Sequence, residues 1–159
     1  MASFNVSELN QFIIDSVSSS YAAGDKTVKV REQNGSTTIT FTKGRYTLHD
    51  NYFGGEPYGG REVVFCDGKP LWMMVYYGVM HGDTDVKAAY AFLMKALLKA
   101  PSDFPFRGPA LLKENEWRYE NAWEGDTKRF SGTEKIFIRD SCVYDASYIG
   151  GLVDQKRSV

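Results

Sequence analysis

The most constraining feature of this sequence is a pattern in residues 54–80 that recurs 72 positions later. The first copy reads GGEPYGGREVVFCDGKPLWMMVYYGVM. Two apolar runs flank Asp67-Gly68, a pair typical of tight β-turns because glycine accepts a positive φ without steric cost. Residues 61–65 and 71–79 therefore predict a β-hairpin. Side chains alternate between the two faces of a strand, and the second strand is apolar on both. We expect helices to cover one of its faces and a second layer, a partner chain or a ligand to cover the other.

A shift of 72 positions aligns this hairpin with a second segment near the C-terminus. The aligned pairs are Tyr58 with Phe130, Gly60 with Gly132, Glu62 with Glu134, Val64 with Ile136, Phe65 with Phe137, Leu71 with Val143, Trp72 with Tyr144, Tyr76 with Tyr148 and Gly78 with Gly150. Five of these nine pairs are identical, and the constant offset preserves the face that each side chain occupies. Chance matches in a chain rich in Gly and Tyr are the alternative explanation. We interpret the recurrence as an internal duplication, with half-repeats at about residues 7–82 and 83–153.

Several short motifs in the same region carry a resemblance to a known family. They are YFGG at 52–55, EVV at 62–64, DG at 67–68, Pro70, Trp72, Met74 and YYG at 76–78, with later echoes at 107–109, 125–126, 132–134 and 150–152. Over residues 45–153 the chain resembles an uncharacterised family of bacterial domains of unknown function, sometimes appended to helix-turn-helix regulators. The resemblance implies an effector-sensing role and no established activity. The family pattern has Asn at the position of Val75 and His at that of Ile149, so this chain departs from it there.

Size and composition exclude several classes of protein. The chain has 159 residues, enough for one domain with its own core, which we place at residues 1–159. Its 19 basic and 20 acidic residues nearly cancel, so the chain has no net positive charge that would attract nucleic acid or an anionic membrane. No apolar run approaches the ~20 residues of a membrane span, and the first residues lack the regions of a signal peptide. Two cysteines are too few for a secreted disulfide scaffold, so we expect a cytoplasmic protein.

The periodicity along the chain predicts the order helix, four strands, helix, three or four strands. The first helix would start at an N-cap Ser7 and stop at Gly24, and the second would start near Asp83 or Thr84 and end before Pro101. The predicted strands lie in a polar hairpin around residues 34–35, at about 45–52, in the hairpin of residues 61–79, and at about 117–123, 133–139 and 142–149. We predict an α+β fold, an antiparallel sheet with two helices on one face. Its two helix-plus-meander halves would be related by a pseudo-two-fold, with a groove between them.

The candidate site residues are two glutamates, an arginine and a set of aromatic side chains. Glu62 and Glu134 occupy equivalent strand positions, and buried carboxylates there would bind a cation or donors, or accept structural hydrogen bonds. Arg107 would meet Glu62 or a ligand, or form an internal ion pair. The aromatic residues would line a cavity or belong to the core. These are Tyr52, Trp72, Tyr76, Trp123 and Tyr148.

Other motifs point to no cofactor and no metal. The glycine pairs at 54–55 and 59–60 precede a strand, whereas a phosphate-binding loop precedes a helix. His49 and His81 have no partner at the spacing of metal ligands, and neither Cys66 nor Cys142 has an adjacent histidine. We interpret the glycines as turn or bulge residues and the cysteines as small buried side chains.

The leading hypothesis is a ligand-binding or sensor domain that is not an enzyme. Its ligand would be a small organic molecule, cationic or aromatic, held between Glu62 and Glu134 and aromatic walls. The first alternative is an enzyme that uses a glutamate as general base with Arg107 as anion partner. The second is a protein-interaction module in which an apolar strand face makes a homodimer or docks a partner.

Overall fold

The computed structural model describes residues 3–22 and 28–156, which form two helices and nine strands. The helices are α1 (Val6–Ala22) and α2 (Val86–Leu97). The strands are β1 (Val30–Arg31), β2 (Thr37–Lys43), β3 (Tyr46–Gly54), β4 (Tyr58–Cys66), β5 (Lys69–Met80), β6 (Leu111–Glu114), β7 (Trp117–Asp126), β8 (Arg129–Ile138) and β9 (Ser141–Leu152). The predicted α+β class, with an antiparallel sheet and two helices, is confirmed. Five strands rather than four precede α2.

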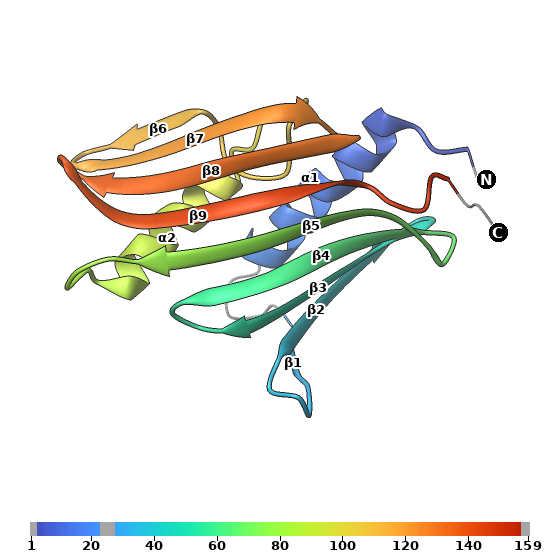
Figure 1. Cartoon of the computed structure of the whole chain (residues 1–159), viewed down its shortest axis with the longest axis horizontal. Coiled ribbons are helices and arrows are strands. Elements are labelled where there is room, and N and C mark those ends of the chain that lie inside the picture. The colour runs from blue at the N-terminus through green and yellow to red at the C-terminus, as the bar shows by residue number, and fades with distance from the viewer. Residues whose placement is uncertain (1–2, 23–27, 157–159) are drawn as a thin grey trace.

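All nine strands form one antiparallel sheet in the order β1-β2-β3-β4-β5-β9-β8-β7-β6. Strands that follow one another in the chain are neighbours within each half, so each half is a meander. The two meanders meet where β5 pairs with β9, and Tyr76 lies opposite Tyr148 in that pair. Both helices lie behind the sheet in Figure 1, on the same face of it.

Helix α1 covers the strands of the first meander. Its N-cap is Asn5, whose Oδ1 accepts a hydrogen bond from the Ser7 backbone N–H at 2.7 Å. The prediction of Ser7 as the N-cap is therefore wrong. Asn and Ser both cap helices well, and the spacing of the apolar residues does not distinguish Asn5 from Ser7. Leu9, Phe12 and Ile13 are buried in one core cluster with residues of β3, β4 and β5, and the ring of Phe12 lies against Phe41 of β2 and Tyr46 of β3. Gly24, the predicted stop, lies outside the described residues.

Helix α2 covers the second meander and begins slightly later than predicted. Its N-cap is Asp85, whose side chain accepts a hydrogen bond from the Ala88 backbone N–H at 3.1 Å. Thr84, a predicted starting point, instead donates its hydroxyl to the His81 carbonyl oxygen in the preceding turn. The helix ends at Leu97, before Pro101 as predicted. Its apolar stripe packs against Tyr119, Ile136, Val143 and Tyr144.

An aromatic cluster joins the two meanders beneath the loop that follows α2. Phe104 stacks on Trp123 at a centroid distance of 4.5 Å, and Phe106 stacks on Phe130 at 4.4 Å. Trp72 is fully buried and lies against both Phe106 and Phe130. The loop of residues 101–110 is therefore held by its own phenylalanines.

The face of the sheet opposite the helices is left open by the described residues. Val75, Tyr77 and Ile149 are 46%, 57% and 59% exposed there, and Val75 lies opposite Ile149 in the β5–β9 pair. The expectation that both faces of the second hairpin strand are covered is therefore not met within the described chain. The alternation on β5 does hold, because Trp72, Met74 and Tyr76 on the helix-covered face are buried.

The two hairpins correspond in their bounds and in their irregularities. Strands β8 and β9 extend across residues 129–138 and 141–152, and β4 and β5 across 58–66 and 69–80. Each hairpin shifts register at one point, between Val64 and Phe65 in the first and between Ile136 and Phe137 in the second. The turn residues Asp67 and Arg139 both have positive φ, 49° and 55°. Apart from the first residue of β8, which lies 71 positions after that of β4, all of these features lie 72 positions apart.

Neither described helix is long and apolar enough to cross a membrane. Helix α1 has 17 residues and carries Glu8, and helix α2 has 12 residues.

Gly132 should tolerate no side chain, because a Cβ there would lie 2.2 Å from the Tyr148 hydroxyl and 2.8 Å from the Ala122 carbonyl oxygen. We predict that Gly132→Ala lowers the free energy of unfolding by about 1–3 kcal/mol in urea denaturation. The control is Gly55→Ala, since a Cβ at Gly55 meets nothing within 4 Å. Equal stability of the two variants would contradict the close packing around Tyr148.

Candidate functional site: a cavity with paired carboxyl groups

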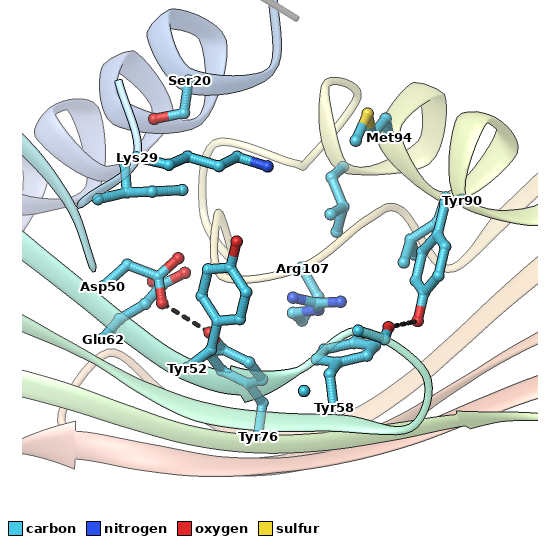
Figure 2. Close-up of a pocket in the computed structure, with 15 residues that line it drawn as sticks. Ser20, Lys29, Asp50, Tyr52, Tyr58, Glu62, Tyr76, Tyr90, Met94 and Arg107 are labelled. Carbon is cyan, nitrogen blue, oxygen red and sulfur yellow. Dashed lines mark hydrogen bonds between the residues drawn. The ribbon is translucent and has the colours of Figure 1, made fainter. Parts of the chain in front are cut away.

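A cavity of about 470 Å³ lies on the helix-covered face of the sheet, between β2–β5 and α2. This volume falls in the range of small-molecule sites. Figure 2 shows carboxyl groups at one end, Tyr90 and Met94 at the other, and Arg107 between them. The lining residues are Ser20, Lys29, Ile39, Asp50, Tyr52, Gly54, Gly55, Tyr58, Glu62, Tyr76, Tyr90, Leu93, Met94, Leu97 and Arg107.

Asp50 and Glu62 form the acidic end of the cavity. They lie opposite each other in the β3–β4 pair, so their side chains project from the same face of the sheet. Tyr76 donates its hydroxyl to Asp50 Oδ1 at 2.6 Å. Burial raises the pKa of Asp50, against the effect of this hydrogen bond. Burial, and then the neighbouring Asp50 charge, raise the pKa of Glu62 to about 8. Near neutral pH the pair therefore holds a proton that two isolated carboxyls would have lost.

Arg107 enters the cavity from the loop after α2, and its charge is balanced from below. Nε donates to Glu134 Oε2 at 3.1 Å and Nη2 donates to Oε1, so the pair is bidentate. Arg107 is 6% exposed and Glu134 is 0% exposed. Burial opposes the arginine charge, but the attraction of Glu134 outweighs it and the pKa of Arg107 is raised. Arg107 therefore brings donor groups to the cavity without bringing a net charge.

The remaining lone pairs of Glu134 are satisfied by two tyrosines. Tyr119 donates to Oε2 at 2.6 Å, and Tyr144 donates to Oε1 at 3.1 Å. The proton of Tyr144 is thereby committed, so the 2.5 Å contact between the Tyr58 and Tyr144 hydroxyls has Tyr58 as donor. Burial raises the pKa of Tyr58, which lines the cavity. A chain of hydrogen bonds thus runs from the cavity wall through Tyr144 to the ion pair.

The loop that carries Arg107 is fixed on both sides of the arginine. Before it, Phe104 and Phe106 are packed in the aromatic cluster. After it, the Gly108 backbone N–H donates to the Tyr119 hydroxyl at 3.0 Å, and the Gly108 carbonyl accepts from Asn121 Nδ2 at 2.9 Å. A fixed backbone holds the guanidinium in one position, which suits directional binding.

The far end of the cavity is closed by a contact between α2 and the β3–β4 turn. The Tyr90 hydroxyl lies 3.0 Å from the Gly55 carbonyl oxygen and 2.7 Å from Glu56 Oε2. Glu56 Oε1 accepts in turn from the Met80 backbone N–H at 2.6 Å. The Tyr58 and Tyr90 rings lie 5.8 Å apart at this end. Aromatic and aliphatic side chains dominate here, in contrast to the carboxyl groups at the other end.

The structure divides the eight residues predicted from sequence between the cavity and the core. Tyr52, Glu62, Tyr76 and Arg107 line the cavity. Glu134 lies beneath Arg107, out of the cavity lining, as the internal ion-pair alternative has it. The other three pack among aromatic rings and are not in the lining: Trp72, Trp123 and Tyr148.

Sequence reasoning missed Asp50, Tyr58, Tyr90 and Lys29, all of which line the cavity. Asp50 shares its strand face with the buried Tyr46 and Leu48, and this alternation was a usable signal. Its position opposite Glu62 depends on the register of β3 against β4, which no local pattern defines. Tyr90 reaches the cavity only because α2 packs across the sheet.

The sequence pattern of one family, described as a domain of unknown function (DUF5680), matches residues 50–153. The chain belongs to this DUF5680 family. Searches of curated proteins and of solved structures each found no match.

The match places most of the cavity inside the DUF5680 domain. Asp50, Tyr58, Glu62, Tyr76 and Arg107 all lie within residues 50–153, whereas α1 and Lys29 precede them. Val75 and Ile149, the two departures from the expected family pattern, are exposed cross-strand neighbours on the open face. Neither is among the residues that line the cavity of this DUF5680 domain.

The raised pKa of Glu62 predicts a pH-dependent stability. The native state keeps a proton that the unfolded chain, with an ordinary pKa of 4.5, releases. The stability from this proton is complete below pH 4.5 and is lost as the pH rises through about 8. Glu62→Gln removes this loss of stability at high pH, because glutamine does not titrate. We predict that its stability relative to wild type is greater above pH 8 than at acidic pH, measured by urea denaturation. A difference that does not change with pH would contradict the assignment.

The buried ion pair predicts a large cost for Glu134→Gln. The variant leaves Arg107 charged and buried without its partner, and such changes cost about 3–5 kcal/mol of unfolding free energy. The matched control is Glu124→Gln on the exposed part of β7, which should stay within about 0.5 kcal/mol of wild type. Chemical denaturation measures both. Similar stabilities for the two variants would show that Glu134 does not balance the charge of Arg107.

Proposed function

We propose that this domain binds a small organic cation with an aromatic or apolar body, and that it acts as a binding or sensor domain rather than as an enzyme. The observation that carries the proposal is the cavity itself, about 470 Å³ in volume, with two facing carboxyl groups at one end and tyrosine rings along its length. Few convergent polar groups in an otherwise apolar cavity are typical of ligand sites.

The charges around the cavity favour a cation over an anion. Arg107 is neutralised by Glu134, so it offers an anionic ligand little net attraction. Asp50 and Glu62 have no such ion pair in the described residues, although the charge of Arg107 acts on both, and those of His49 and the exposed Lys29 act on Asp50. The rings of Tyr52, Tyr58 and Tyr76 add attraction, since an aromatic face favours a cation by about 0.5–2 kcal/mol.

A duplication would explain why two equivalent glutamates have different partners. The proposal that the two halves are copies related by a pseudo-two-fold is supported by the common offset of 72 in strand bounds and register shifts. Glu62 and Glu134 are equivalent in this scheme. Glu134 received Arg107 as partner and became structural, whereas Glu62 faces Asp50 and the cavity. The ligand-binding role then belongs to the first half.

The biological setting is part of the proposal. The resemblance to bacterial domains that accompany helix-turn-helix regulators supports an effector-sensing role in the cytoplasm. A homodimer or other protein-interaction role is the alternative, supported by the exposed Val75, Tyr77 and Ile149 on the open face. Sedimentation velocity at two concentrations tests the homodimer.

A catalytic alternative has one specific observation in its favour. Glu62 has a pKa of about 8 and faces a cavity, as a general base near neutral pH would. Incubating a bound ligand with the protein and analysing it by mass spectrometry tests this alternative. Conversion by wild type and none by Glu62→Gln would support an enzyme, and an unchanged ligand supports the binding role.

The test of ligand class uses three probes of one shape and different charge: benzamidine (cationic), benzamide (neutral) and benzoate (anionic). We predict that benzamidine raises the melting temperature most, because a ligand selective for the native state stabilises it. In Glu62→Gln this shift should shrink, and in the control Glu124→Gln it should persist. The proposal fails if neither benzamidine nor larger aromatic cations raise the melting temperature. It also fails if benzoate raises the melting temperature more than benzamidine does.

A further inference from the structure

The facing carboxyl groups of Asp50 and Glu62 have a consequence for how the site loads its ligand. They are cross-strand neighbours at the acidic end of the cavity, and Tyr76 orients one of them. Two carboxylates that face the same buried site raise the pKa of one of them, unless a cation lies beside them. The cavity therefore holds either a proton on the pair or an external positive charge beside it.

The surrounding groups do not supply that cation. The charge of Arg107 acts to lower the pKa of both carboxyls, but its Nε and Nη2 are bound to Glu134, and it forms no ion pair with either carboxyl in the described residues. Lys29 is exposed and, among the same residues, forms no ion pair with either carboxyl. His49 also favours the ionised form of Asp50, and it lines a separate polar hollow with Asn51 and Arg61. The other titratable groups facing the pair are the hydroxyls of Tyr52, Tyr58 and Tyr76.

Burial acts on the pair in the same direction as their mutual repulsion. It raises the pKa of both carboxyls, and that of Glu62 reaches about 8. The pair thus carries a proton through the neutral range, and an arriving cation must compete with it.

We infer that the site binds its cationic ligand in exchange for the proton shared by Asp50 and Glu62, so that each binding event releases a proton to solvent. This inference rests on the proposed function, since it names how that same site takes its ligand. No bond other than an O–H of a carboxyl group breaks. The proton goes to buffer, and the ligand charge replaces it between the two carboxylates. The domain would then respond to pH as well as to ligand.

Linkage gives the sign and size of the effect. Below the pKa of the free pair, each unit rise in pH makes the deprotonated form about tenfold more abundant. The dissociation constant for benzamidine should therefore fall roughly tenfold between pH 6 and pH 7 and level off above pH 8. Benzyltrimethylammonium, whose charge does not titrate, should show the same dependence, because the proton comes from the protein.

Calorimetric titration of the full chain at pH 7 tests the exchange directly. The apparent binding enthalpy should differ between phosphate and Tris buffers by nearly the full difference between their ionisation enthalpies. That difference corresponds to the release of nearly one proton for each ligand bound. Glu62→Gln has no proton to release there and should lose both the buffer dependence and the pH slope, changing less than about twofold between pH 6 and pH 7. Asp50→Asn should reduce both as well, and serves if Glu62→Gln does not fold. Glu124→Gln should behave as wild type.

The outcomes separate the two proposals. Binding with equal enthalpies in both buffers and a flat pH profile would overturn the exchange and leave the ligand-binding function standing. A pH slope that persists in both Glu62→Gln and Asp50→Asn would assign the proton to another group and also overturn it. No binding of either cation at any pH would overturn the exchange together with the proposed function.

Discussion

The buried pair of Arg107 and Glu134 is the interaction on which the rest of this structure depends. Glu134 receives two hydrogen bonds from the guanidinium and one each from Tyr119 and Tyr144, so all its lone pairs are used. The pair joins the loop after α2 to the centre of the second meander. The same loop packs on the aromatic cluster and supplies Arg107 to the lining of the cavity. A buried charge pair is costly to desolvate, and only this complete set of partners makes it tolerable.

The same pair also determines the character of the cavity. Because Glu134 cancels the charge of Arg107, the net charge at the site depends mainly on Asp50 and Glu62. These two carboxyls are half-buried and face tyrosine rings, and burial keeps a proton on them near neutral pH. The two glutamates that lie 72 positions apart thus have different surroundings: Glu134 is buried in an ion pair with Arg107, and Glu62 lines the cavity. The proton exchange proposed above follows from that difference.

Much of the local structure was readable from the chain. The alternation in β4 and β5, the turn at Asp67-Gly68 and the stripe of α2 predicted elements close to those observed. Four of the eight predicted site residues lie at the cavity. The three aromatic residues among the other four could not be assigned from sequence. An aromatic side chain on a covered face gives the same sequence pattern whether it lines a cavity or packs against a neighbouring side chain. Trp72 packs against Phe106 and Phe130, whose loop has no periodic pattern from which its path follows.

By itself, the sequence determined which faces of the strands are apolar, where the chain turns, and that a glutamate stands in each hairpin at positions 72 residues apart, Glu62 and Glu134. These are properties of period and spacing, which act over a few residues. Only the tertiary structure decided which carboxyl meets Arg107 and that Asp50 stands opposite Glu62. Those outcomes depend on strand register and on the path of one loop across the sheet. Both are set by packing between residues far apart in the chain, where no local pattern carries the information.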